Sequence, residues 1–178
     1  MAQVHLGLFS DRYHADQAVD DLTRAGYDPA EMSIIAGDTV VNEQAVEQTS
    51  APVVEGTASG ATTGGVIGGI AGLLVGLGAI TLPGIGALFV GGPIAAVLGL
   101  TGAAATTVSG VVTGALAGGL VGALVSLGVP RETAEIYESG IKAGGVLLAV
   151  PTRDDREQES RDILESHGAD QIRSVTLA

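Results

Sequence analysis

Residues 4–10, VHLGLFS, read as a short β-strand, because Val4, Leu6 and Leu8 place an apolar side chain at every second position. Alternation with a period of two is typical of a strand that buries one face. A helix is predicted to follow, with Ser10 as its N-terminal cap and Gly26 at its end, where a left-handed residue is favoured. A second strand, MSII at 32–35, completes a β–α–β unit at the start of the chain.

The same pattern recurs near the other end of the chain, 142 residues later. Residues 146–152, VLLAVPT, alternate from Val146, and Thr152 takes the position of Ser10 as a candidate cap. Further pairs at this offset are Asp20 with Asp162, Leu22 with Leu164 and Gly26 with Gly168, and the last strand is IRSVTL at 172–177. Two such units commonly combine into one four-stranded antiparallel sheet with both helices on one face. The sequence therefore predicts an α+β fold, a split ferredoxin-like βαβ + βαβ domain.

The two halves are separated by an uncharged insert. Residues 56–130 contain no Asp, Glu, Lys or Arg, yet they hold 21 of the 28 glycines. Nine of these recur at every fourth position, in two runs: Gly60, Gly64, Gly68, Gly72 and Gly76, then Gly110, Gly114, Gly118 and Gly122. On a helix this spacing leaves a groove without side chains, against which another helix packs closely. The insert is therefore predicted to be an all-α glycine-zipper helical hairpin, with these nine residues at the helix contacts.

Two stretches of the insert, Gly60–Ile80 and Ala105–Leu127, are each long enough as helices to cross a bilayer. Both ends of the insert must emerge on the same side for the halves to combine, so an even number of crossings is required. We predict two, with residues 84–101 as a re-entrant, interfacial or short packing helix. A turn is predicted before it, at Pro83, Gly84 and Gly86. The alternative is a soluble homo-oligomeric shell, tube or filament whose hydrophobic helices form a protein wall.

A further helix is predicted from Arg131 to Ala143, since Pro130 precedes it and Gly144 and Gly145 follow it. We expect it to dock the insert onto the domain, with Tyr137 on its apolar face. The predicted segments are the first half-domain (1–37), a polar linker (38–57), the zipper insert (58–129), and the docking helix with the second half-domain (130–178).

The chain shows no residue pattern that is typical of a catalytic, cofactor-binding or metal-binding site. It has no cysteine, which excludes disulfides and thiol catalysis, and its net charge of −12 with no basic stripe argues against nucleic-acid binding. The three histidines, His5, His14 and His167, show no metal-ligand spacing, and we expect them at the surface. No catalytic, cofactor-binding or metal-binding residues are predicted, and the protein is expected not to be an enzyme.

Four stretches carry a resemblance to a known family: GLLVGLGAITLPGIG at 72–86, GGPIAAVLG at 91–99, GALAGGLVGALVSLGVP at 114–130 and ETAEIYESGIKAGGVLLAV at 132–150. The chain resembles bacterial general stress proteins, described as heat- or low-temperature-induced or as membrane proteins of unknown function. The resemblance implies induction under stress and a glycine-zipper membrane segment, and it supplies no catalytic residues. Relatives often carry more Lys and Arg beside the insert than this acidic chain does.

These features together predict a non-enzymatic, stress-related structural protein that self-associates through its glycine-zipper helices. Its predicted partners are further copies of itself, as a homo-oligomer, and a lipid bilayer. The predicted location is a membrane with the acidic domain in the cytoplasm, and a cytoplasmic, lipid-free assembly is the alternative.

Overall fold

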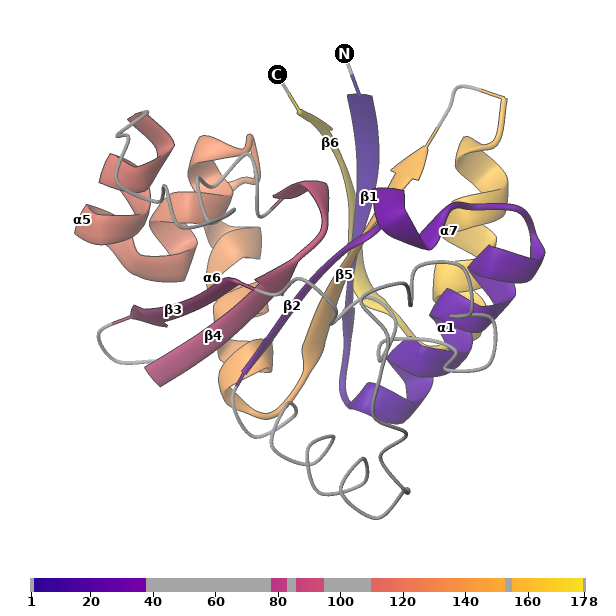
Figure 1. Cartoon of the computed structure of the whole chain (residues 1–178), viewed down its shortest axis with the longest axis horizontal. Helices are drawn as coiled ribbons and strands as arrows, with labels where there is room; N and C mark the ends of the chain where they lie inside the picture. The colour runs from indigo at the N-terminus through magenta and orange to yellow at the C-terminus, as the bar shows by residue number, and fades with distance from the viewer. Residues whose placement is uncertain (1, 38–77, 83–85, 95–109, 153–154, 178) are drawn as a thin grey trace, which may run out of the picture.

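The computed structural model describes residues 2–37, 78–82, 86–94, 110–152 and 155–177 (Figure 1). The predicted linker at 38–57 lies outside these residues. The elements of the first part are β1 (Ala2–Phe9), α1 (Arg12–Arg24), the 3-10 turn η1 (Pro29–Glu31) and β2 (Ser33–Gly37). The insert contributes β3 (Gly78–Leu82), β4 (Gly86–Gly91) and α5 (Gly110–Ser126). The remainder forms α6 (Arg131–Lys142), β5 (Val146–Thr152), α7 (Glu157–Ser166) and β6 (Asp170–Leu177).

The described strands form one antiparallel sheet in the order β3-β4-β2-β5-β1-β6. The predicted α+β class is confirmed. The two ends of the chain interleave, because β1 lies between β5 and β6, and β2 pairs with β5. Ala2 pairs with Leu177, so the start of β1 lies beside the end of β6, as Figure 1 shows.

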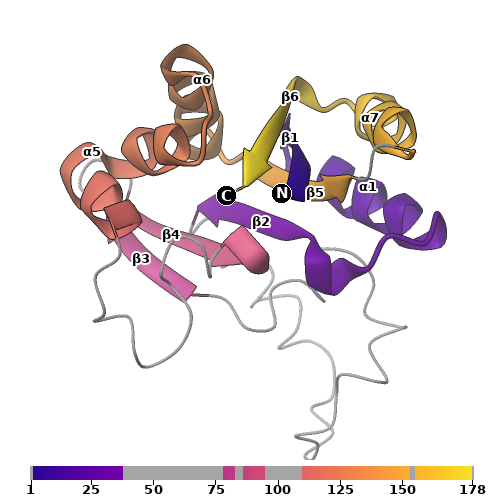
Figure 2. The same ribbon diagram turned by 90° about the horizontal axis from the view of Figure 1, so that it is seen from above.

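Helices cover both faces of the sheet. In Figure 1, α1 and α7 lie on one side of the central strands, and α5 and α6 lie on the other; Figure 2 shows the same separation from above. Each face has its own hydrophobic cluster, one around Phe9 and Leu22 and the other around Leu6 and Tyr137. Because β5 is buried on both faces, its segment VLLAV is apolar at every position.

The predicted strand phase of the internal repeat is wrong. The alternating residues of β1 that begin at Val4 face α5 and α6, whereas those of β5 that begin at Val146 face α1 and α7. A shift of one residue exchanges the two faces of a strand. Where both faces are buried, apolar residues occur in both phases, so alternation does not identify the face.

The helical part of the repeat agrees with the structure. Leu22 of α1 and Leu164 of α7 are both fully buried in the same cluster. Gly26 and Gly168 follow their helices with φ of +91° and +78°, the left-handed conformation that was predicted.

Both predicted helix caps lie at the wrong residue. The helix α1 begins at Arg12, so Asp11 rather than Ser10 is the cap, and its Oδ1 accepts a bond of 3.0 Å from the backbone N–H of His14. Thr152 is the last residue of β5, and α7 begins only at Glu157. A side chain placed several residues before a helix cannot reach its free N–H groups.

The all-α expectation for the insert is wrong between residues 78 and 91, where β3 and β4 form a hairpin. Leu88 and Val90 are fully buried and Phe89 is less so, a period-two pattern. The hairpin forms because β4 pairs with the free edge of β2, with Ile34 opposite Gly91. Within the predicted helix at 84–101, residues 86–91 form β4 instead, and at the end of the predicted span Gly60–Ile80, residues 78–80 belong to β3. Residues 60–77, 84–85 and 95–101 lie outside the described part of the chain.

The second predicted span, a single helix over Ala105–Leu127, is also wrong. The helix α5 runs from Gly110 to Ser126 and is broken at Gly119, whose φ of 62° and ψ of −151° belong to a region that glycine alone occupies readily. Residues 105–109 lie outside the described residues. Nowhere in the described ranges does a helix combine the length and apolarity that a bilayer crossing requires.

Candidate functional site

The first candidate site is a groove on α5 and α6 with a volume of about 370 Å³. The helix α5 contributes the small and apolar lining residues, and α6 contributes the charged ones, which are called the rim below. It is lined by Gly118, Val121, Gly122, Val125, Arg131, Glu135 and Glu138. The groove thus contains two of the nine predicted helix-packing glycines.

The outer side of α5 in this groove is open. A Cβ atom built on Gly118 would meet no atom of the described chain within 4 Å. Val125 is 42% exposed. On the opposite side of α5, Leu120 and Leu124 are buried against the sheet and α6. The second part of α5 therefore has one packed face and one open face with small and apolar residues.

The rim is held by two ion pairs within α6. Arg131 Nε lies 3.1 Å from Glu135 Oε1, and Lys142 Nζ lies 2.6 Å from Glu138 Oε1. Exposed pairs four residues apart on a helix contribute only about 0.3–0.5 kcal/mol each. These charges are therefore available to exchange partners when another surface approaches.

The four packing glycines that the structure describes do not form one continuous helical stripe. Gly110 and Gly114 lie in the first part of α5, and the break at Gly119 separates them and Gly118 from Gly122. The five glycines of the first run, from Gly60 to Gly76, lie outside the described residues.

The predicted docking residues lie within α6 and in the turn that follows it. Tyr137 is fully buried, and its hydroxyl donates a hydrogen bond to the backbone carbonyl of Gln171 in β6. Burial raises the pKa of Tyr137. Gly144 has φ of +95°, and a Cβ at Gly145 would lie 2.6 Å from the carbonyl oxygen of Phe9. The two glycines therefore let α6 turn sharply into β5 while the backbone passes close to β1.

Of the predicted turn residues, Gly86 is the first residue of β4 and pairs with Leu82 of β3. Pro83 and Gly84 lie outside the described residues.

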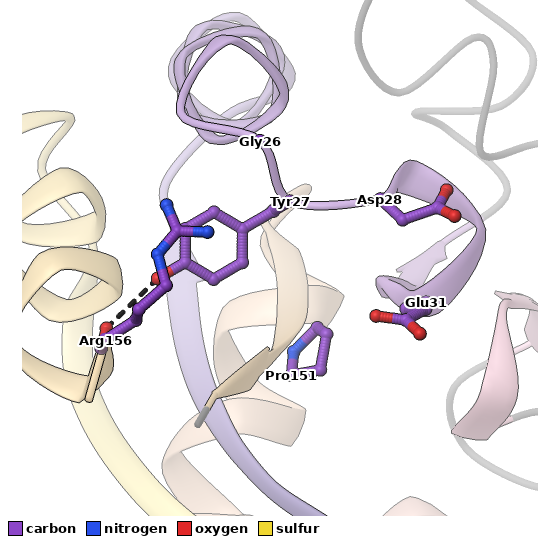
Figure 3. Close-up of a pocket in the computed structure, with 6 residues that line it drawn as sticks. All are labelled: Gly26, Tyr27, Asp28, Glu31, Pro151 and Arg156. Atoms are coloured by element: carbon purple, nitrogen blue, oxygen red, sulfur yellow. Dashed lines mark hydrogen bonds between the residues drawn. The ribbon is translucent and has the colours of Figure 1, made fainter. Parts of the chain in front are cut away.

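The second candidate site is a pocket of about 220 Å³ at the seam between the two half-domains (Figure 3). The first half contributes the turn after α1 and the η1 segment, and the second half contributes the end of β5 and the residue before α7. The lining residues are Gly26, Tyr27, Asp28, Glu31, Pro151 and Arg156.

Arg156 is fixed in this pocket by contacts with both halves. Its guanidinium carbon lies 4.3 Å from the centre of the Tyr27 ring, a cation–π contact. Its Nη2 donates to the carbonyl of Ala25 at 2.5 Å, and its Nε donates to Glu159 at 2.7 Å. The Tyr27 hydroxyl in turn donates to the Arg156 carbonyl at 3.0 Å. These bonds give the seam a preformed positive group.

The third candidate is a polar cluster around His5, which overturns the expectation that His5 is a surface residue. The ring is fully buried, and its Nδ1 lies 2.7 Å from the Ser160 hydroxyl on α7. Its Nε2 has no hydrogen-bond partner among the described residues and lies 3.5 Å from Glu157 Oε1. Burial lowers the pKa of His5; Glu157 opposes this effect, and Arg161 adds to it.

This cluster is not arranged for nucleophilic catalysis. The Ser160 hydroxyl donates to the Glu157 carbonyl at 3.0 Å, so it accepts from His5 Nδ1–H and has no proton to transfer to that nitrogen. Ser160 is also fully buried, out of reach of a substrate. The cluster instead fastens β1 to α7, across the two half-domains.

The other two histidines differ from each other. His14 is exposed and contacts Asp11, as expected for a surface residue. His167 is only partly exposed, and its Nε2 lies 2.9 Å from Asp21 Oδ2 on α1. The bonds from His167 and then from Arg24 hold the pKa of Asp21 below its ordinary value. Among the described residues, no group of three or more His, Cys, Asp or Glu side chains is arranged to hold a metal ion.

Sequence reasoning missed both the seam pocket and the His5 cluster. The position of His5 between two apolar strand residues indicates only that its side chain lies on the opposite face of the strand. The sequence alone does not show that α7 covers this face and buries the ring. For the pocket no single motif exists, since its residues come from segments more than a hundred positions apart.

Residues 4–82 match the heat induced stress protein YflT domain. The match extends from β1 through β3 and thus includes the first strand of the insert. No match was found among curated proteins or among solved structures.

Proposed function

We propose that this chain, whose residues 4–82 match the heat induced stress protein YflT domain of a general stress protein family, has a structural role in stress that rests on self-association. The contact surface is the groove of α5 and α6. In this proposal the two chain ends are the halves of a ferredoxin-like domain that carries the groove on the face opposite α1 and α7. The protein performs no catalysis in this role.

One observation carries the proposal, namely the open space above Gly118 in a groove with exposed apolar neighbours. A second helix can approach the α5 backbone there without displacing any described side chain. Burial of Val125, which is 42% exposed, adds hydrophobic stabilisation to such a contact.

The rim charges favour a second copy of the same chain as the occupant. In a two-fold symmetric contact both copies use the same patch of residues. A contact from one residue of the first copy to a second residue of the other copy is therefore repeated in the opposite direction. The rim carries one cation, Arg131, and the acids Glu135 and Glu138. Arg131 of each copy can therefore pair with an acid of the other copy, in place of its weak internal pair.

A bilayer surface is the second candidate occupant. The observation that favours it is that no charged residue occurs between Gly110 and Ser126, along the whole of α5. The lipid proposal and the dimer proposal use the same face of the protein, so one experiment can separate them.

The test measures the mass of the full chain in detergent-free buffer by sedimentation velocity over a range of protein concentrations. We expect the parent chain to associate reversibly and Gly118→Leu to shift it toward the monomer, because the new side chain fills the groove. Gln158→Leu, which adds the same side chain to an exposed position on α7, is the matched control and should leave the association unchanged.

A monomer at all concentrations for the parent chain, or an unchanged oligomer for Gly118→Leu, would overturn the self-association proposal. Flotation of the same variants with lipid vesicles tests the second candidate. Vesicle binding that Gly118→Leu leaves intact, in a chain that does not self-associate, would favour the bilayer instead.

A further inference from the structure

The seam pocket presents opposite charges within a small volume. Figure 3 shows Arg156 on one side of the Tyr27 ring and Glu31 on the other, with Pro151 below the ring. Asp28 lines the same side as Glu31. A ligand in the pocket would therefore meet the Arg156 guanidinium at one end and the Glu31 carboxylate at the other, while the Asp28 carboxylate is turned away toward η1.

The positive end is rigid. The stacking of Arg156 on Tyr27 and its bonds to Ala25 and Glu159 use Nε and Nη2. Its Nη1 lies 4.0 Å from the position that a Cβ on Gly26 would occupy, and Gly26 has none. An arginine held in this way donates to a carboxylate with little further loss of side-chain entropy.

The negative end is accessible. Asp28 and Glu31 are exposed at the two ends of η1, and Asp28 Oδ1 accepts the backbone N–H of Ala30 at 2.9 Å. That bond holds the Asp28 carboxylate toward η1, as Figure 3 shows, so the Glu31 carboxylate is the one that can accept bonds from an ammonium group in the pocket.

We propose that the seam pocket binds a small zwitterion, a free α-amino acid, with its carboxylate at Arg156 and its ammonium at Glu31. The volume of about 220 Å³ suits a molecule of this size, since a water molecule occupies roughly 30 Å³ of the liquid. A simple anion would leave Glu31 unpaired, and a simple cation would form no bond with Arg156, whose charge Glu159 already offsets in part. The zwitterion satisfies both ends at once.

Binding at this position has a consequence for the whole domain. Glu31 belongs to the first half of the chain and Arg156 belongs to the second, so the complete pocket exists only when the halves are assembled. A ligand that binds only the folded state raises stability by RT ln(1 + [L]/Kd). The amino acid would therefore stabilise the seam, independently of the α5 groove and of self-association.

The test uses the full chain, labelled with ¹⁵N, and three probes at equal millimolar concentrations: glycine, acetate and methylammonium. Glycine carries both charged groups, and each of the other two carries one. We expect glycine to shift the amide signals of Gly26, Tyr27, Asp28 and Glu31 in a saturable manner. Acetate and methylammonium should bind at least about tenfold more weakly, since each forgoes one charge-assisted contact.

Glu31→Gln tests the site itself, because it removes one charge and leaves the fixed Arg156 in place. We expect it to weaken glycine binding at least about tenfold. Glu132→Gln, an equivalent change at an exposed position on α6, is the control and should have no effect. The proposal is overturned if glycine shifts none of these signals, if acetate or methylammonium binds equally well, or if both variants behave alike.

Discussion

The two neighbouring glycines in the middle of α5 give the sharpest test of the structure. Gly118 lies within the helix with open space at its Cβ position, whereas Gly119 interrupts the helix at φ of 62° and ψ of −151°. Alanine at Gly118 should stabilise the protein by about 1 kcal/mol, the gain in helix propensity. Alanine at Gly119 should destabilise it by about 1–3 kcal/mol, because a Cβ is disfavoured in that region.

The two variants therefore should differ by roughly 2–4 kcal/mol in the free energy of unfolding, with opposite signs relative to the parent chain. Urea unfolding followed by circular dichroism measures this difference. The comparison is made at a protein concentration at which sedimentation gives the same mass for all three chains, since Gly118 also lines the groove.

A continuous glycine-zipper helix gives a different result. In such a helix both glycines have helical angles, so both alanine variants would be stabilised to a similar extent. Equal stabilisation of the two would refute the break at Gly119 and would restore the straight helix that the sequence predicts.

Three further changes test other parts of the fold. Because burial lowers the pKa of His5 below its ordinary 6.5, the unfolded chain binds the proton first; the free energy of unfolding should fall as the pH drops below 6.5, by at most about 1.4 kcal/mol per pH unit, and His5→Gln should flatten this dependence. Tyr137→Phe leaves the Gln171 carbonyl without its donor and should cost about 0.5–1.5 kcal/mol in thermal unfolding. Gly145→Ala places a Cβ 2.6 Å from the Phe9 carbonyl and should destabilise the chain by more than about 1 kcal/mol, whereas a neutral effect would contradict that close approach.

The parts of the fold that were predictable are those with local signals. A helix ends at Gly26 and at Gly168 because each residue takes the left-handed conformation, and glycine at such positions is visible in the sequence. The boundaries of α6 are equally local, since Pro130 precedes it and Gly144 follows it. The α+β class was predictable because a β–α–β pattern with such a glycine occurs at both ends of the chain.

The hairpin of β3 and β4 was not predictable from local signals. GAITL and GALFVG are short apolar runs between glycines, and such runs fit a buried helix as well as a strand. What selects the strand is the free edge of β2, about 50 residues earlier in the chain. Tertiary pairing therefore overrides the helical interpretation that the glycine spacing favours.

The glycines and apolar residues of the insert have at least two different uses. At Gly92, φ is +81° and a Cβ would lie 2.0 Å from the carbonyl of Met32, so glycine is required there to bring the chain against β2. The backbone of Ile94 then bonds the buried Ser33 hydroxyl at 3.0 Å. Leu88, Val90, Ile94, Leu120 and Leu124 are all buried by the protein itself. A charge-free, glycine-rich segment is thus partly explained by close packing within the domain, and in the described part of the insert the open face at Gly118 is the surface that a partner would cover.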